Sequence, residues 1–401
     1  MTASATLARL DPQGASASVE ALRVLCISHS AISRIHGRLR YGSLLNRPDL
    51  RLDLVMPNRW SERGRWLTPD LPHADEDWVH ALPIRWARAG SATWHLHHYM
   101  GLGRLMRRVQ PQVIHLWQEP WSLVALQALY LRNRLCPHAT LVLEVDQNLH
   151  KRLPAPFEQI RRTVLRQTGH VLARSDEAIQ VVRACGYHGP AGRIGYGVDP
   201  SVFRPMDRAP GHGTPAGLTV GYVGRLIEEK GVGDLIEAVS RAATPVNLAI
   251  MGEGPFRASL IAQAAASGIS DRLHILPWGS PEDVAAFMNR IDILALLTRT
   301  TDTVREQFGR VIIEAQACGT PVIGSGSGAI ADVVGEGGWI VPERSPAAVA
   351  ALLDRLARRP MELASARVQA MRQVSERFSF GTQAELLERA WRSMSGQHQP
   401  P

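Results

Sequence analysis

Residues 305–324 read Arg305-Glu306-Gln307-Phe308-Gly309-Arg310-Val311-Ile312-Ile313-Glu314-Ala315-Gln316-Ala317-Cys318-Gly319-Thr320-Pro321-Val322-Ile323-Gly324. An apolar run at 294–297 precedes this stretch, and a polar loop connects the run to Gly309. We predict a strand at the run, a helix over about 310–318 that ends at Gly319, and a second strand from Pro321. Such a helix begins at the carboxyl edge of a sheet, where its first backbone N–H groups lack partners. Residues 308–311 therefore form a candidate anion site.

Two glutamates flank the start of this predicted helix. Glu306 lies before it and Glu314 lies inside it, and at ~100° per residue they would point about 80° apart. They therefore address different parts of one ligand, and carboxylates suit sugar hydroxyls because each accepts several hydrogen bonds. Taken alone, the same residues also fit two solvated glutamates beside a core helix.

A second notable segment surrounds one of the two lysines of the chain. Lysine and arginine together number 45, and only Lys151 and Lys230 are lysines. Lys230 follows Arg225 by five residues in the segment Gly224-Arg225-Leu226-Ile227-Glu228-Glu229-Lys230-Gly231. A compact ammonium and a planar guanidinium both bind phosphate, and together they could neutralise a pyrophosphate without a metal ion. An arginine-rich codon bias that leaves a few lysines by chance is the alternative.

Composition limits the class of protein. The chain has 401 residues, enough for two domains, and its 45% hydrophobic and 20% charged content is typical of a globular protein. The net charge of +8 favours anionic partners. Four scattered cysteines have no metal-ligand spacing and suit a reducing compartment. Residues 1–20 lack the apolar core of a signal peptide, and no run of eighteen apolar residues occurs, so we expect a cytoplasmic protein.

Short apolar runs alternate with helical patterns along the chain. The predicted strands are 23–28, 52–56, 113–116, 140–145 and 170–173 in the first half, and 218–223, 246–251, 273–276, 293–297, 321–324 and 339–341 in the second. This alternation predicts an α/β protein with parallel sheets covered on both faces.

The predicted organisation has two domains and a linker. Residues 206–217 are rich in proline and glycine, as expected of an interdomain linker. We predict a disordered tail at 1–20, a first domain at 21–205, a second domain at 218–380, and a final helix and tail at 381–401. Two doubly wound, Rossmann-like domains would leave an interdomain cleft at the carboxyl ends of their strands, where such folds bind ligands.

The joint spacing of these motifs resembles glycosyltransferase family 4, the retaining group 1 glycosyltransferases of GT-B fold. The resemblance rests on Gly-Arg-x-x-x-x-Lys-Gly at 224–231 followed by Glu-x-Phe-Gly-x-x-x-x-Glu-Ala at 306–315. Further matching segments are Gly252-Glu253-Gly254-Pro255, Trp278-Gly279, and Asp292 before a strand. The resemblance covers residues 23 to about 380 and is most specific from 194 to 342.

The resemblance implies a retaining transfer of a sugar from a nucleotide-sugar donor to a hydroxyl of a glycan or lipid-linked acceptor, in polysaccharide or glycolipid synthesis. The nucleotide-sugar is a co-substrate, and neither a metal ion nor another cofactor is implied. Arg225 and Lys230 would neutralise the diphosphate, Glu306 would hold the donor sugar, and Glu314 would hold the ribose. The implied donor contacts are Gly224, Arg225, Lys230, Gly252, Glu253, Trp278, Glu306, Phe308, Gly309, Arg310, Val311 and Glu314.

The chain departs from the family pattern beside the predicted acceptor site. Ser28-His29-Ser30-Ala31-Ile32-Ser33-Arg34 follows the first strand, where many members carry a paired-glycine loop. Asp146 follows the strand at 140–145, where many members carry a histidine near the reacting sugar. We therefore assign Asp146 to the catalytic set with Arg225, Lys230 and Glu306. Asp332 stands where glutamate is common.

Three residues are assigned to the acceptor side: Arg34, His115 and Glu119. His115-Leu116-Trp117-Gln118-Glu119-Pro120 lies at the end of the predicted strand 113–116 and resembles a pattern of the acceptor domain in which a histidine precedes Glu-Pro. A polar turn made rigid by Pro120 is an equally good interpretation of the same residues.

The segment 85–108 mixes arginines with tryptophan, tyrosine and methionine. This mixture suits an anchor on anionic lipid, which would place the protein peripherally on the inner face of the membrane, but an ordinary surface helix also fits it. Asp75-Glu76-Asp77 spells a DxD motif, which we interpret as a solvated acidic loop. We predict no metal site and no nucleic-acid partner. The rival hypothesis is a non-catalytic GT-B scaffold that docks on a membrane or polyanion through its basic face.

Overall fold

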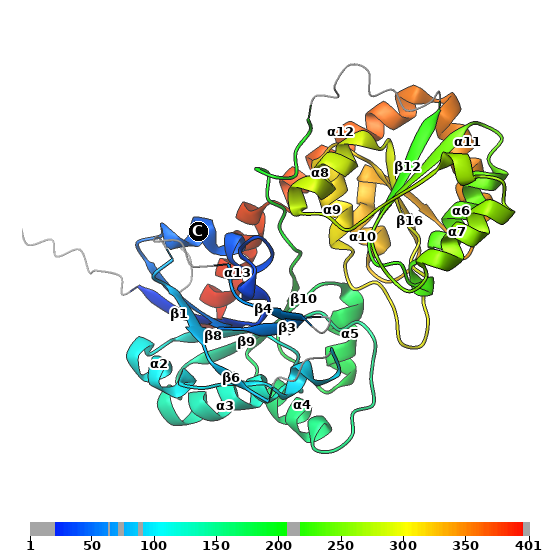
Figure 1. Cartoon of the computed structure of the whole chain (residues 1–401). Helices are drawn as coiled ribbons and strands as arrows, with labels where there is room; N and C mark the ends of the chain where they lie inside the picture. The colour runs from blue at the N-terminus through cyan, green and yellow to red at the C-terminus, as the bar shows by residue number, and fades with distance from the viewer. Residues whose placement is uncertain (1–20, 63–64, 71–75, 87–90, 207–216, 396–401) are drawn as a thin grey trace, which may run out of the picture.

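The computed structural model describes residues 21–62, 65–70, 76–86, 91–206 and 217–395. The predicted tail at 1–20, most of the predicted linker and the last six residues lie outside the described residues. Two α/β domains lie one above the other in Figure 1, each built on a parallel sheet. The α/β architecture predicted from the sequence is therefore confirmed.

The first domain contains a seven-stranded sheet in the order β11-β10-β9-β8-β1-β2-β5. Its strands are β1 (Leu22–Ser28), β2 (Leu50–Pro57), β5 (Val79–Leu82), β8 (Val113–Trp117), β9 (Thr140–Val145), β10 (His170–Ala173) and β11 (Ala191–Arg193). Every predicted strand of this half is present. The edge strands β5 and β11 were not predicted. Both are short and most of their residues are partly exposed, so they lack the apolar run that identifies a buried parallel strand.

Two antiparallel pairs and several helices complete the first domain. The pairs are β3 (Trp60–Glu62) with β4 (Arg65–Leu67), and β6 (Ile84–Arg85) with β7 (His98–Tyr99). The α-helices are α1 (Gly42–Leu45), α2 (Leu102–Val109), α3 (Leu123–Leu135), α4 (Phe157–Arg166) and α5 (Asp176–Ala184).

The second domain contains a six-stranded sheet in the order β14-β13-β12-β15-β16-β17. Its strands are β12 (Leu218–Val223), β13 (Val246–Met251), β14 (Leu273–Leu276), β15 (Ile293–Leu296), β16 (Val322–Ser325) and β17 (Gly338–Val341), all of which were predicted. The helices are α6 (Val232–Arg241), α7 (Arg257–Ala266), α8 (Pro281–Arg290), α9 (Arg310–Ala317), α10 (Ile330–Val334), α11 (Pro346–Arg358) and α12 (Pro360–Arg377).

The last helix, α13 (Phe380–Ser395), returns to the first domain, where Figure 1 shows it in red beside the first sheet. Its apolar side chains are buried in one cluster with β1 and β2, and Trp391 is fully buried there. The chain passes between the domains twice, near Val198 and near Phe378. These two segments lie side by side, since Val198 N donates to Phe378 O at 3.1 Å. The α13 helix thus ties the second domain back to the first.

One surface expectation is wrong, and the membrane anchor at 85–108 stays a prediction. Glu76 of the DxD segment is buried, and its carboxylate accepts from Arg38 Nε at 3.1 Å, because the equally buried Arg38 needs a partner. In the 85–108 segment, Tyr99 is buried while Trp86 and Met100 are exposed. Arg104, Arg107 and Arg108 of α2 are exposed as well. Within the described ranges, no helix is both long and apolar enough to span a bilayer.

We expect Trp391→Ala to lower the free energy of unfolding by about 3–5 kcal/mol, because it empties a fully buried site between α13 and the first sheet. Urea denaturation followed by circular dichroism would measure this loss. Trp86→Ala is the matched control, since Trp86 is 66% exposed and its removal creates no cavity. A loss below about 1 kcal/mol for Trp391→Ala would contradict the packing described for α13.

Candidate functional site

The donor side begins with a loop that leaves β12 and lies against the loop after β13. An added Cβ at Gly252 would collide with the carbonyl of Gly224, and one at Gly254 would collide with the carbonyl of Leu226. Gly231 has φ +68° at the start of α6, and its Cβ would collide with Leu297 O. Only glycine allows these close backbone approaches. The segment that carries Arg225 and Lys230 is thereby pressed against the carboxyl edge of the second sheet.

Lys230 and Glu306 meet at this edge although 76 residues separate them. Lys230 Nζ lies 2.6 Å from Glu306 Oε2, and Thr298 Oγ1 donates to the same oxygen at 2.9 Å. Both charged side chains are mostly shielded from solvent. The two predicted motifs therefore form one site, with a cation and a carboxylate in direct contact.

The helix start predicted after Gly309 is observed as α9, which begins at Arg310. Gly309 has φ +81°, a left-handed conformation that turns the chain into the helix, and Phe308 beside it is buried. Glu314 lies one turn inside the helix. Burial raises the pKa of Glu314 to about 6, although the charge of Arg310 acts in the opposite direction.

The other predicted donor residues lie along the same edge of the sheet. Arg225, Glu253 and Trp278 follow β12, β13 and β14, and their side chains are exposed. These strands are neighbours, and Leu226 N donates to Glu253 O at 2.9 Å. The structure therefore groups the predicted donor residues at one carboxyl edge.

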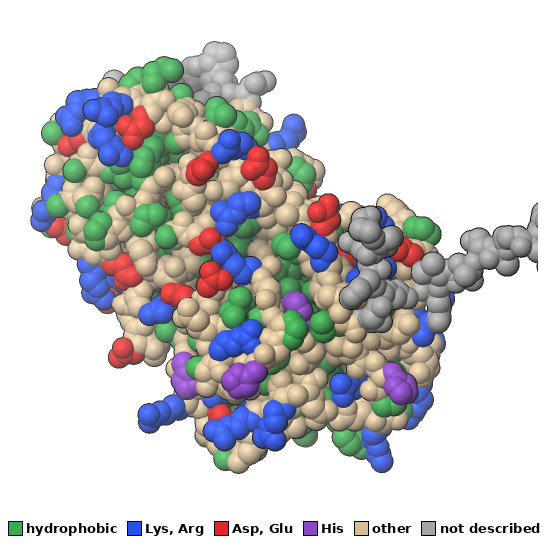
Figure 2. Space-filling model, turned by 180° about the vertical axis from the view of Figure 1, so that it is seen from behind, with side chains coloured by type: hydrophobic (Ala, Val, Ile, Leu, Met, Phe, Trp, Pro, Cys, Tyr) green, Lys and Arg blue, Asp and Glu red, His purple; other side chains and the backbone are tan. Residues whose placement is uncertain are grey.

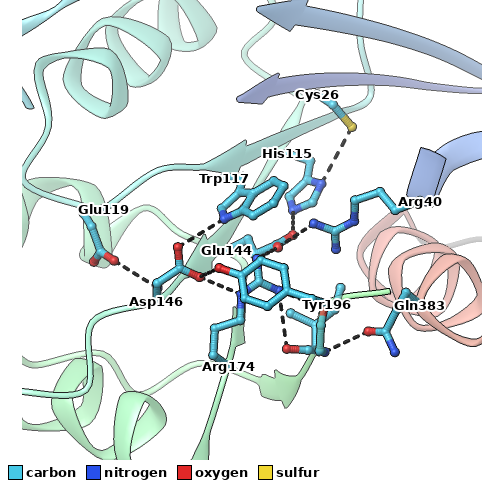
Figure 3. A network of polar contacts seen from close by, with 12 residues as sticks. Cys26, Arg40, His115, Trp117, Glu119, Glu144, Asp146, Arg174, Tyr196 and Gln383 are labelled. Atoms are coloured by element: carbon cyan, nitrogen blue, oxygen red, sulfur yellow. Dashed lines mark hydrogen bonds and ion pairs between the residues drawn. The ribbon is translucent and has the colours of Figure 1, made fainter. Parts of the chain in front are cut away.

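On the first domain, Asp146 follows β9 and is held on several sides (Figure 3). Arg174 Nε donates to Asp146 Oδ1 at 2.6 Å, and Trp117 Nε1 donates to Oδ2 at 3.3 Å. Glu119 Oε1 accepts from the backbone N–H groups of Asp146 and Gln147 at 2.9 Å each. Burial and the Asp146 charge raise the pKa of Glu119 to about 7, against those two hydrogen bonds. Glu119 therefore shapes the loop that presents Asp146.

A buried ionic network that the sequence did not predict lies behind Asp146. Glu144, the fifth of the six residues of β9, has no exposed surface. Its Oε1 bonds Arg40 Nη1 at 2.6 Å and also Arg174, and its Oε2 lies 3.1 Å from His115 Nε2. Burial alone would raise the pKa of Glu144, but the charges of Arg174 and Arg40 hold it well below its usual range. The signal available in the sequence was a lone carboxylate inside an apolar strand.

Of the three predicted acceptor-side residues, the structure argues against His115, which is buried. His115 is buried between Glu144 and Cys26, with its ring 5.7 Å from that of Trp391, because its side chain points to the face of the sheet that α13 covers. Arg34 has acidic neighbours: its Nε lies 3.5 Å from Glu76 Oε1, and its backbone N–H donates to Asp70 Oδ2 at 2.9 Å. Glu119 is the one that reaches the edge with Asp146.

His29 lies at this edge in their place. Gln118 Nε2 lies 2.8 Å from His29 Nδ1, and the His29 ring stacks on Trp60 at a centroid distance of 4.6 Å. Burial lowers the pKa of His29 to about 4, so its imidazole is neutral at neutral pH.

The two carboxyl edges meet directly. Asn148 Nδ2, two residues after Asp146, donates to Glu306 O at 2.8 Å. Arg305 Nη1 lies 3.3 Å from Glu177 Oε1 of α5. The loop with the acceptor-side aspartate and the loop with the donor-side glutamate therefore touch. Among the residues that the structure describes, no three His, Cys, Asp or Glu side chains gather as metal ligands.

Comparison with known proteins agrees with this arrangement. The family profile of glycosyl transferases group 1 matches residues 214–374. The 2-deoxystreptamine glucosyltransferase of Streptomyces kanamyceticus is 32% identical over 123 residues, which is 30% of each chain. The D-inositol 3-phosphate glycosyltransferase of Rhodococcus opacus is 30% identical over 260 residues, 60% of this chain and 56% of the relative. The chain thus spans about half or less of the curated relatives it matches.

Solved structures resemble the chain over nearly its whole length. Sucrose-phosphate synthase from Thermosynechococcus elongatus has a TM-score of 0.71 at 18% identity, covering 94% of this chain and 100% of that one. Anabaena HepE in complex with UDP and glucose has a TM-score of 0.65 at 16% identity, covering 93% and 100%. The predicted fold is confirmed: this chain has the GT-B fold, and its residues 214–374 match the group 1 glycosyl transferases.

Proposed function

We propose that this protein is a retaining glycosyltransferase of family 4 that moves a sugar from a nucleotide-sugar donor to a hydroxyl of an acceptor. The observation that carries the proposal is the 2.6 Å contact between Lys230 and Glu306 at the start of α9. It joins the two halves of the donor motif at a helix start that suits anions. A scaffold that binds no donor would not need Lys230 and Glu306 in contact.

In the proposed donor complex, Arg225 and Lys230 neutralise the diphosphate, including the charge that develops as the nucleoside diphosphate leaves. Two cations at one edge make a metal ion unnecessary for this purpose, and no other cofactor is proposed. Glu306 accepts hydroxyls of the donor sugar and Glu314 those of the ribose. Support comes from solved neighbours of the same fold, one of which is described in complex with UDP-glucose.

The proposed acceptor hydroxyl lies between the Asp146 loop and the Glu306 loop, which touch through Asn148. The names of the relatives include 2-deoxystreptamine and D-inositol 3-phosphate, both hydroxylated rings, as their substrates. We propose a glycan or lipid-linked acceptor of this hydroxylated kind for cell-surface polysaccharide or glycolipid synthesis.

We propose that the protein is cytoplasmic and contacts the inner face of the membrane peripherally, and its surface charge supports this. On the face shown in Figure 2, Lys and Arg side chains predominate over the first domain, whereas the second domain mixes both signs. The exposed arginines of α2 beside Trp86 and Met100 would contact anionic lipid. The alternative, a non-catalytic scaffold that docks through this basic face, predicts membrane binding without donor turnover.

The first test is a screen of UDP-, GDP- and ADP-sugars for binding, hydrolysis and transfer to either named acceptor. We expect one donor class to be turned over, and Lys230→Ala to reduce turnover about 100-fold because the diphosphate loses a fixed cation. Lys151→Ala is the matched control, since it removes the other lysine at an exposed position. If no donor is bound or turned over, the scaffold alternative holds.

The need for an ammonium is tested by Lys230→Arg. We expect this variant to lose about tenfold or more in turnover despite its retained charge, because the larger planar guanidinium cannot occupy the position that the compact ammonium takes beside Glu306 and Thr298. The measurement is kcat for the donor found in the screen. Full activity would mean that the lysine is incidental.

The pKa of Glu314 predicts a pH dependence of donor binding. Because burial raises this pKa to about 6, the group is a carboxylate above that pH and is protonated below it. Only the carboxylate accepts two strong hydroxyl bonds, so donor affinity should fall as the pH drops from about 7.5 to about 5. Isothermal titration should show a flat profile for Glu314→Gln, whereas Glu119→Gln should keep the dependence. A wild-type profile as flat as that of Glu314→Gln would exclude this role.

A further inference from the structure

Tyr196 lies between two guanidinium groups from different domains. It follows β11, just before the chain crosses to the second domain. Arg174 Cζ of the first domain lies 4.0 Å from the Tyr196 ring centroid, and Arg310 Cζ of the second lies 4.2 Å from it. Both guanidinium groups therefore lie within cation–π distance of the same ring. The ring is therefore a shared cation–π partner across the domain interface.

The two arginines differ in what their N–H groups do. Arg174 is buried, and its N–H groups donate to Asp146, Glu144 and the backbone carbonyls of Ile194 and Gly195. Arg310, in contrast, makes no hydrogen bond and no ion pair with any other residue in the described part of the chain. Its guanidinium is held at the ring, while no described residue takes its N–H groups. The N–H groups of Arg310 thus remain available to a ligand, although the position of its guanidinium is already restricted by Tyr196.

The surroundings keep the ring in place. The Phe308 ring meets it edge-on at a centroid distance of 5.0 Å, and Phe308 in turn meets Phe378 at 5.6 Å. The Tyr196 hydroxyl reaches Asp146 Oδ1 only at 3.4 Å, a weak contact beside the 2.6 Å bond that Arg174 makes to the same oxygen. The aromatic face, and not the hydroxyl, is therefore the part of Tyr196 that links the domains.

We propose that Tyr196 is a positioning residue that holds Arg310 ready to bind the anionic part of the nucleotide-sugar donor at the start of α9. Arg310 is the first residue of that helix, four residues before Glu314 and beside the unpaired backbone amides. Because Tyr196 belongs to the chain segment of the first domain, donor binding to the second domain then depends on how the two domains sit together. This inference rests on the proposed function.

The test is a double-mutant cycle on donor affinity, measured by isothermal titration with UDP-glucose first and then with the other donors of the screen. We expect Arg310→Ala and Tyr196→Leu each to weaken binding roughly tenfold, the size of a desolvated cation–π contact. The double variant should be no weaker than Arg310→Ala alone, because Tyr196 acts only through Arg310. Tyr196→Phe keeps the ring and should stay within about threefold of the wild type.

Tyr187→Leu is the matched control. Tyr187 is also buried with an arginine over its ring, Arg183 at 5.3 Å, but it lies inside the first domain. This control should lower Tm without changing donor affinity. If Tyr196→Leu does not fold, Tyr196→Met, which keeps apolar bulk without an aromatic face, takes its place.

Three outcomes would overturn the proposal while leaving the proposed function intact. They are unchanged or tighter binding by Tyr196→Leu, losses that multiply in the double variant, and a Tyr196→Phe loss equal to that of Tyr196→Leu. If instead the wild type binds no donor at all, the proposed function fails and this inference fails with it.

Discussion

A carboxylate with no exposed surface organises the carboxyl edge of the first sheet. Removing a charge from water costs several kcal/mol unless partners replace the water, and Glu144 has Arg40, Arg174 and His115 as partners. Arg174 also holds Asp146 and lies against Tyr196. The position of the predicted catalytic aspartate therefore follows from the need to satisfy a buried charge two residues earlier, near the end of β9. Figure 3 shows this chain of contacts running from Cys26 to Glu119.

The second domain reaches its geometry by a different means. Its loops approach so closely that only glycine fits at Gly231, Gly252 and Gly254, and these contacts set the height of the Arg225–Lys230 segment above the sheet. Lys230 and Glu306 then satisfy each other across two neighbouring strand ends. The donor side is thus shaped by backbone contact, whereas the acceptor side is shaped by buried ions.

The parts that the sequence predicted well are those with a local physical signal. Each buried parallel strand appears as an apolar run, and the start of α9 is marked by the turn at Gly309. The proximity of Lys230 and Glu306 was predicted only because their spacing resembles a known family. His115 was misplaced because successive side chains of a strand point to opposite faces, and a strand buried on both faces gives no pattern that distinguishes them. Glu76 was misplaced because its partner Arg38 is 38 residues away.

By itself, the sequence determined the α/β class, the residue ranges of the principal strands and the donor motifs, since these depend on residues close together in the chain. Only the tertiary structure decided which charges are buried together, that α13 covers the first sheet, and that Tyr196 lies between Arg174 and Arg310. The physical reason is that burial and pairing are set by side-chain direction and by contacts between distant segments. Neither leaves a local pattern in the chain.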